Sequence, residues 1–331
     1  MAVYDCCPFL NENDLYEIRL NQHWDYVDKF IVLEAGETHT GRPKSFNFDH
    51  KRFDKYKSKI IYRTFNSFIH EVRTNLDLLD AHNTRNRLAA GQNTDDWTRD
   101  HFQGNYFVKI LREIQANDDD IVYISALDEI LNHSALEQGL AQFTDKGKIY
   151  PLHMAGQTET IRFEVGGKTV TEIRPSFGFV LDIYTYKFNL RCTTLENIAV
   201  GQMTEFGVLK QIFPTTMRSI GLSTHPNIKD AGWHFASMDN TNGSKVLTKM
   251  QSWAHSRDQN IDNNKATYSA TNEEEALRCL FFDSKINVVP INPDSHPLYL
   301  VDNLEKYDEY IDDGWFDNYK KNHPGFFRNN E

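Results

Sequence analysis

Two adjacent carboxylates, Asp128 and Glu129, follow closely after a short apolar run, Ile121–Ile124. Such a run is typical of a buried strand, so the sequence places both carboxylates just beyond a strand's end. Carboxylate oxygens at that position suit Mg²⁺ or Mn²⁺, hard cations that bind oxygen ligands and bridge diphosphates. The alternative is structural, because acidic residues also favour the positive end of a helix. Spacing alone leaves both interpretations open.

The elements that must position these carboxylates alternate between strand-like and helix-like segments. Apolar runs predict strands, and residues spaced by three and four predict amphipathic helices. The expected strands are Val3–Phe9, Phe30–Leu33, Ile60–Phe65 and Ile121–Ile124, and the expected helices are Asn13–Trp24, capped by Asn13, and Trp97–Ile114. This alternation predicts an α/β fold with a mostly parallel central sheet flanked by helices.

In such a sheet, ligands bind beyond the carboxyl ends of the strands. The segments expected at that edge are Pro8–Glu12, Glu34–Thr40 and Ser125–Glu129. Later in the chain, we expect strands at Ile161–Val165, Thr169–Ile173 and Phe177–Tyr186 that extend the sheet, and helices at Lys245–Trp253 and Asn272–Phe282. Together these segments predict one cleft at one edge of one sheet.

Composition and charge narrow the class of protein. The 331 residues are 40% hydrophobic and 25% charged, which is a globular mix. The net charge of −11 makes nucleic acid an unlikely partner, because an acidic surface repels a polyanion. No uninterrupted apolar stretch reaches about 18 residues, so we expect no integral membrane segment. With no signal-peptide profile and no zinc or disulfide spacing among four cysteines, we expect a soluble cytoplasmic protein. The sequence carries no signal for an oligomeric state.

A set of motifs follows in order along the chain: Tyr4–Phe9, Asn11–Glu12, Glu17–Leu20, Val27–Ala35, Thr38–Lys44, Arg99–Asn105, Ser125–Ile130, Gly232–Ala236 and Ser252–His255. In this order they resemble glycosyltransferase family 17, the β-1,4-mannosyl-glycoprotein N-acetylglucosaminyltransferases. The resemblance covers roughly residues 3–258 and is weaker between about 150 and 225. It implies a GT-A type nucleotide-diphospho-sugar transferase fold over residues 1–260, with a C-terminal extension over 261–331 packed on the same domain.

The resemblance also implies a reaction. It is inverting transfer of GlcNAc or a related sugar from a UDP-sugar to a glycan acceptor, assisted by Mn²⁺ or Mg²⁺. Because the chain shows no membrane anchor, we expect a soluble enzyme of bacterial or viral type. A rival interpretation is a metal-dependent hydrolase that uses Asp128, Glu129 and a histidine.

Several residues are implied as donor-binding. The uridine would lie over the ends of the first two strands, near Pro8, Phe9, Asn11, Glu12 and Glu34. Glu34 either accepts a hydrogen bond from the uracil imide or is a surface acid beside Lys44. Arg19 either reaches a phosphate or makes an internal ion pair. Asn105 belongs to one of the family motifs, and Trp233 either stacks on a sugar face or lies in the core.

The chain departs from the family at the metal motif. The usual Asp-x-Asp-Glu-Ile-Pro is here Ala126-Leu127-Asp128-Glu129-Ile130-Leu131. The resemblance still implies metal contact by Asp128, with His234 and His255 as candidates to complete the site. Ala126 leaves three explanations open: natural tolerance, an inactivating substitution, or a non-catalytic protein that binds sugar nucleotides or glycans. A second departure is Gly104, where the family usually has an arginine.

Inverting transfer needs a general base on the acceptor hydroxyl, and a carboxylate can supply it. The candidates are Glu129, Glu205, Asp230 and Asp258. In GT-A enzymes the base usually lies well downstream of the metal motif, which favours Glu205 or Asp258 as the catalytic residue. A purely structural role is the alternative for each.

Overall fold

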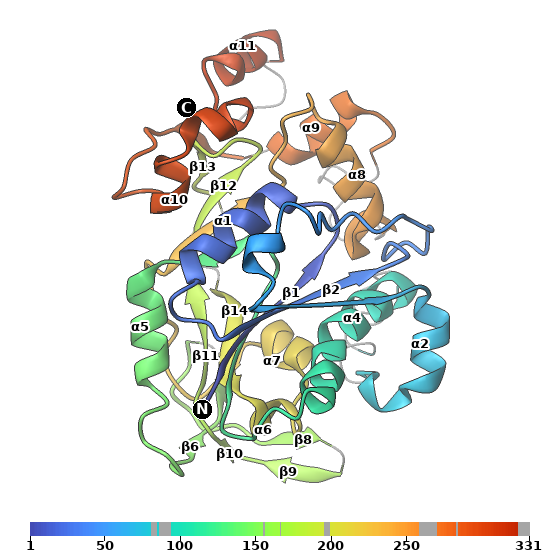
Figure 1. The fold of residues 1–331 in the computed structure, drawn as a ribbon, viewed down its shortest axis with the longest axis vertical. Coiled ribbons are helices and arrows are strands. Elements are labelled where there is room, and N and C mark those ends of the chain that lie inside the picture. Colours follow the sequence, from blue (N-terminus) through green and yellow to red (C-terminus); the bar gives the residue numbers. More distant parts are fainter. Residues whose placement is uncertain are drawn as a thin grey trace.

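Six strands form the central sheet of the computed structural model, which describes residues 1–80, 85, 94–154, 156–165, 167–194, 199–257, 270–282 and 284–323. They are β1 (Val3–Phe9), β2 (Lys29–Ala35), β3 (Ile60–Phe65), β4 (Ile121–Ile124), β11 (Ser176–Val180) and β14 (Ala199–Glu205). Their order is β11-β14-β4-β1-β2-β3 (Figure 1). The four strands predicted in the first 130 residues are therefore confirmed, and they lie side by side.

The sheet is mixed, which corrects the expectation of a mostly parallel one. The pairs β4–β1, β1–β2 and β2–β3 are parallel, whereas β14 is antiparallel to both β4 and β11. Between β11 and β14 the chain forms two strands of a second sheet. It then returns to the central sheet as β14, which runs in the direction opposite to β4 and β11. The carboxyl ends of β1, β2 and β4 nevertheless meet at one edge, as the sequence predicts.

Helices cover both faces of this sheet. Helix α4 (Thr94–Glu113) packs on one face, where Phe102 and Phe107 share a buried cluster with Cys6 of β1. Helix α1 (Asn13–His23) packs on the other face, in a cluster that contains Cys7. Neighbouring residues of a strand point to opposite faces, which explains this division. Asn13 does not cap α1, because its amide donates to the carbonyl of Asn47.

A second sheet of five strands has the order β17-β13-β12-β16-β5. Its strands are β5 (Glu129–Leu131), β12 (Asp182–Thr185), β13 (Leu190–Cys192), β16 (Gly232–Ala236) and β17 (Ile286–Val288). The single strand predicted over 177–186 is thus two strands in two sheets. Glu129 begins a strand, so the helix-start alternative for Asp128-Glu129 is wrong. The next helix, α5 (His133–Ala141), is capped by Asn132.

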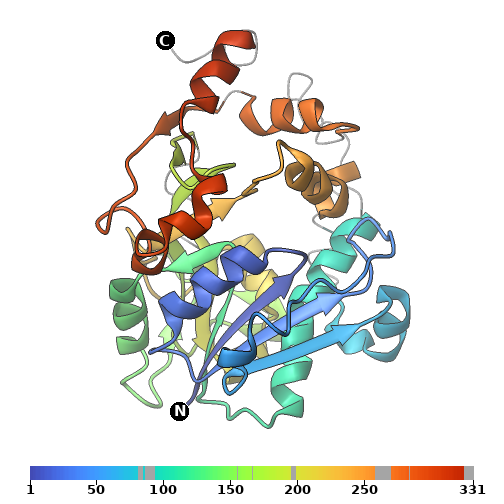
Figure 2. The same ribbon diagram turned by 45° about the horizontal axis from the view of Figure 1, so that its top comes forward.

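The remaining helices and ribbons surround these two sheets. They are α2 (Phe68–Thr74), α6 (Phe206–Leu209), α7 (Pro214–Ile220), α8 (Ser244–Ser252), α9 (Glu273–Phe281), α10 (Leu298–Val301), α11 (Trp315–Asn322), and the short strands β6 (Tyr150–Pro151), β7 (His153–Met154), β8 (Phe163–Val165), β9 (Lys168–Val170), β10 (Glu172–Ile173) and β15 (Leu222–Ser223). The predicted helices over 245–253 and 272–282 are confirmed as α8 and α9, which lie against each other (Figure 2).

The C-terminal segments pack on the earlier part of the chain. Strand β17 pairs with β13, and α10 contacts α1. In Figures 1 and 2, α11 lies at the far end of the molecule from the N-terminus. Among the described residues, no helix is both long enough and apolar enough to cross a membrane.

Candidate functional site

Two adjoining cavities open at the carboxyl ends of the parallel strands. The first, the strand-end cavity, has a volume of about 250 Å³ and is lined mainly by Pro8, Phe9, Glu12, Ala35, Thr38, Lys44, Ala126, Asp128 and Lys249. The second, the α4 cavity, measures about 460 Å³ and is lined by residues that include Trp97, Asp100, His101, Ser125, Arg218 and His255. Both cavities share Pro8, His39, Asp100, Gln103, Ala126 and Trp253, so they form one continuous cleft.

Five of the residues predicted from the sequence line the strand-end cavity: Pro8, Phe9, Glu12, Ala126 and Asp128. They come from the ends of β1 and β4, where the topology places a ligand. Asn11 lies instead in a neighbouring small recess, which is also lined by Glu12 and Lys249.

Glu34 is fully buried and does not line either cavity. Its carboxylate accepts hydrogen bonds from Lys44 Nζ at 2.5 Å, the Asn47 amide at 2.7 Å and the Tyr62 hydroxyl at 2.8 Å. Glu34 does pair with Lys44, as the second alternative predicted, but it is buried and not on the surface. Protein donors already occupy both of its oxygens. Glu34 therefore anchors the loop that carries Lys44 to the cavity, and it is not placed to contact a base.

Asn105 and Trp233 also lie outside both cavities. The Asn105 side chain joins α4 to α7, because its oxygen accepts a hydrogen bond from the Thr215 hydroxyl at 2.8 Å. The Trp233 indole donates to the carbonyl of Ser295 at 2.6 Å, and its ring packs in the core. The core alternative for Trp233 is the one observed, and the indoles of Trp97 and Trp253 line the cleft instead.

Asp128 forms a buried ion pair at the wall of the strand-end cavity. Lys249 Nζ lies 2.7 Å from its Oδ2, and His234 Nε2 lies 3.5 Å from its Oδ1. Burial alone would raise the pKa of Asp128, but the neighbouring Lys249 and His234 hold that pKa well below its usual range. Burial would likewise lower the pKa of Lys249, and the charge of Asp128 raises it instead. Both groups are therefore charged at neutral pH.

The three predicted metal ligands do not come together. His255 lies in the α4 cavity with its ring 4.5 Å from that of Trp97, whereas Asp128 and His234 face each other near the strand-end cavity. Among the described residues, no group of three histidine, cysteine or acidic side chains is arranged to hold a metal ion. Ala126 offers no side-chain oxygen, and an ammonium already pairs with Asp128. The donor set that the described residues offer at this site does not fit a divalent cation.

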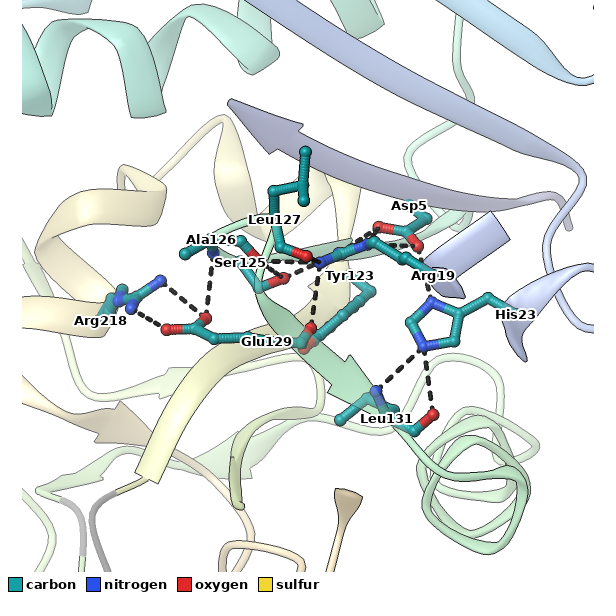
Figure 3. Close-up of polar contacts among 10 residues, drawn as sticks. All are labelled: Asp5, Arg19, His23, Tyr123, Ser125, Ala126, Leu127, Glu129, Leu131 and Arg218. Atoms are coloured by element: carbon teal, nitrogen blue, oxygen red, sulfur yellow. Dashed lines mark hydrogen bonds and ion pairs between the residues drawn. The ribbon is translucent and has the colours of Figure 1, made fainter. Parts of the chain in front are cut away.

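Arg19, which is fully buried, holds the segment from Ser125 to Leu131 in place (Figure 3). Its guanidinium donates to the carbonyls of Ala126, Leu127 and Glu129 at 2.8, 3.1 and 3.0 Å. It also pairs with Asp5, with an Nη2–Oδ1 distance of 2.5 Å. The internal ion pair is thus the correct alternative for Arg19, which positions the cavity wall and does not face a phosphate.

Asp5 and His23 complete this buried network (Figure 3). His23 Nδ1 lies 2.7 Å from an Asp5 oxygen, and the Leu131 amide donates to His23 Nε2 at 3.0 Å. The Leu131 carbonyl also lies 3.2 Å from Nε2, and burial lowers the pKa of His23. Burial alone would raise the pKa of Asp5, but Arg19 and His23 lower it to about 2.

Glu129 closes the same loop from the other side. Its carboxylate accepts from the Ala126 amide at 3.0 Å and pairs with Arg218 (Figure 3). Arg218 lines the α4 cavity, as does Gly104, where the family usually carries an arginine. A Cβ at Gly104 would lie 2.6 Å from Thr215 Cγ2, so a larger residue here would require the Thr215 side chain to shift. The positive charge of this cavity wall comes from α7 instead of α4.

Two of the candidate general bases, Glu205 and Asp230, do not line the cleft. Glu205 pairs with Arg174 and stands opposite Ile121, at the amino end of β4. Because β14 runs antiparallel to β4, it ends where β4 begins, and Glu205 lies at the opposite edge of the sheet from the cleft. This position corrects the prediction of Glu205 as the catalytic residue. Asp230 does not line either cavity. Asp258 lies outside the described residues.

Sequence reasoning missed the polar residues at the junction of the two cavities. Asp100 Oδ1 lies 3.4 Å from His39 Nδ1, and His39 Nε2 lies 2.8 Å from Gln103 Oε1. His39 belongs to a strand-end segment, and Asp100 and Gln103 belong to a family motif, which are the signals that pointed to this region. Lys249 carried no such signal, because α8 reaches the cleft only through the tertiary fold.

The fold and site define an α/β protein with a ligand cleft at the carboxyl edge of its sheet. The family model described as glycosyltransferase family 17 matches residues 1–168. The chain belongs to glycosyltransferase family 17. The resemblance of motifs beyond residue 168 lies outside this match. No curated protein matches the chain.

Among solved structures, the chain is similar to that described as "Crystal structure of 4-diphosphocytidyl-2C-methyl-D-erythritol synthase". The identity is 12% and the TM-score is 0.35, with 70% of this chain and 89% of that chain covered.

Proposed function

We propose that this protein is an inverting glycosyltransferase of GT-A type that transfers GlcNAc or a related sugar from a UDP-sugar to a glycan acceptor. Membership of family 17 supports glycosyl transfer. The single observation that carries the proposal is the position of the strand-end cavity, between the ends of β1, β2 and β4 and beside Ala126 and Asp128. Those two residues occupy the positions of the family's paired aspartates.

The donor and the acceptor divide the cleft between them. Uridine lies over Pro8 and Phe9, and the diphosphate lies beside the Ala126–Asp128 turn. The acceptor enters the α4 cavity, where Trp97 and Trp253 offer indole rings to sugar faces. The bond between sugar and diphosphate then lies at the junction, which is lined by His39 and Asp100.

Asp100 is our candidate for the general base. It lines both cavities and its side chain is 37% exposed, so an acceptor hydroxyl can reach it. The carboxylate accepts the hydroxyl proton as the oxygen attacks the anomeric carbon and UDP leaves from the opposite face, which inverts the configuration. His39, 3.4 Å away, orients the carboxylate.

The test is UDP release from a panel of UDP-sugars, with and without a glycan acceptor. We expect Asp100→Asn to lower kcat about 100-fold or more, because a positioned base contributes that much, while UDP affinity is unchanged. Asp182→Asn is the matched control, because Asp182 is similarly exposed (45%) and pairs with Arg191 away from the cleft. The proposal fails if the wild type neither hydrolyses nor transfers any nucleotide-sugar, and the role of Asp100 fails if its variant retains full turnover.

A second candidate is a protein on the same fold that binds sugar nucleotides without turning them over. Ala126 favours it, because one carboxylate of the family's metal motif is missing. Ala126→Asp separates the two functions. A large gain in turnover identifies an inactivated enzyme, whereas binding without turnover in both proteins identifies a binding role.

A further inference from the structure

Lys249 brings a positive charge into the strand-end cavity at the place where the proposed diphosphate lies. It projects from α8, lines the cavity together with Ala126 and Asp128, and its side chain is 27% exposed. Its partner Asp128 is only 6% exposed. Both residues line the cavity, and Lys249 is the more exposed member of the pair.

The ammonium keeps donors for a ligand. A lysine ammonium has three N–H groups, and Asp128 accepts one of them at 2.7 Å. Asp128 therefore holds Lys249 in place at the cavity wall. Phosphate oxygens that enter the cavity meet the remaining N–H groups, which suit them as a point-charge partner.

The same pair disfavours a divalent cation. A metal ion bound to Asp128 would lie within a few ångströms of the ammonium, and two cations at that separation repel strongly in a partly buried site. Ala126 supplies no side-chain oxygen, and the His234 imidazole lies 3.5 Å from Asp128 Oδ1. Ala126 in place of an aspartate and Lys249 beside Asp128 therefore both disfavour a metal ion at this site.

We propose that Lys249 takes the place of the divalent cation: its ammonium donates hydrogen bonds to the diphosphate of the donor, so donor binding and turnover need no metal ion. This inference rests on the proposed function. A leaving group that carries negative charge must be stabilised by a fixed positive charge, and Lys249 supplies it without recruiting an ion from solution.

Calorimetric titration of the full chain with UDP tests the proposal. We expect the same affinity, within about twofold, in EDTA and in Mn²⁺, because Lys249 replaces the ion. Lys249→Ala should weaken UDP binding by about tenfold or more, and Lys249→Arg should keep most of it, because a charged partner is retained. Lys245→Ala is the matched control: it lies one turn earlier on α8, is 32% exposed and pairs with Asp14, and it should bind UDP as the wild type does.

The outcomes separate this inference from the proposed function. UDP binding that appears only with Mn²⁺ overturns the role of Lys249 and leaves the glycosyltransferase standing. Unchanged binding by Lys249→Ala also overturns that role. No UDP binding in either buffer overturns both proposals. If Lys249→Ala does not fold, the wild type in EDTA and the arginine variant still decide the question.

As a second variant, Ala126→Asp combined with Lys249→Ala exchanges the ammonium for a carboxylate. We expect this double variant to bind UDP only when Mn²⁺ is added. If the double variant binds UDP equally well with and without Mn²⁺, the proposal that Lys249 replaces the metal ion is contradicted.

Discussion

At the scale of single residues, buried charged side chains fix the conformation of the loop that forms the cavity wall. Arg19 directs its donors to three carbonyls of the loop that follows β4, and Asp5 balances its charge. Because none of these groups is exposed, each depends on its partner for the hydrogen bonds that water would otherwise supply. The network therefore fixes the turn that carries Asp128, although Arg19 and Asp5 do not themselves line either cavity.

The lowered pKa of Asp5 predicts how stability depends on pH. The pKa is about 2 in the folded protein and 3.8 as its ordinary value, so the ionised carboxylate stabilises the fold at pH values above about 4. That contribution, roughly 2 kcal/mol, is lost as pH falls from about 4 towards about 2. Urea titrations of the wild type and Asp5→Asn should therefore show a difference in unfolding free energy that shrinks over this range.

The control for this prediction is Asp182→Asn, which removes an exposed ion pair with Arg191. Its effect on the unfolding free energy should be below about 1 kcal/mol. A difference between the wild type and Asp5→Asn that stays constant between about pH 5 and pH 2 would show that Asp5 has an ordinary pKa.

At the scale of elements, the pairing of β5 with β16 sets the distance between Asp128 and His234. His234 stands opposite Glu129, and Gly232 stands opposite Leu131. Gly232 has φ +137°, and a Cβ there would lie 2.2 Å from the carbonyl oxygen of Ile130. Only glycine fits this approach, so the glycine determines how closely the two strands meet.

Gly232→Ala should lower the free energy of unfolding by roughly 3 kcal/mol, through backbone strain and a steric clash together. Gly147→Ala is the control, because Gly147 also has a positive φ of +91° but no atom within 4 Å of the added Cβ. It should cost about 1 kcal/mol from strain alone. If chemical denaturation shows that the two substitutions lower the free energy of unfolding equally, the steric clash at Gly232 contributes nothing.

The elements that the sequence predicted well are those governed by local patterns. The strand Ile121–Ile124 and the aromatic face of α4 follow from apolar spacing, and the cleft follows from where parallel strands end. Glu205 was misplaced because its surroundings depend on strand direction, and the choice between the two interpretations of Trp233 depended on a contact with Ser295. Lys249 was missed because Asp128 lies 121 residues away from it in the chain.

At the scale of the whole molecule, side chains from the C-terminal segments form hydrogen bonds and ion pairs with α1, which packs on the sheet. Glu17 of α1 accepts hydrogen bonds from Lys306 at 2.6 Å and from the Tyr299 hydroxyl at 2.9 Å. Tyr310 reaches Asp14 of the same helix at 2.6 Å. Since α1 carries Arg19, these contacts connect the end of the chain to the loop that lines the cavity. Part of the acidic surplus is thus used in internal pairs, although the net charge of −11 remains.

The central claim is that the strand-end cavity binds the nucleotide-sugar donor, and calorimetric titration with UDP-GlcNAc tests it most directly. Ala126 lines both parts of the cleft, so Ala126→Trp should fill it and weaken donor binding by at least about tenfold, or 1.4 kcal/mol. Ala141→Trp, on the exposed side of α5, should bind as the wild type does. Saturable binding by the wild type that Ala126→Trp abolishes is the predicted result. Equal binding by the wild type and Ala126→Trp would contradict the account.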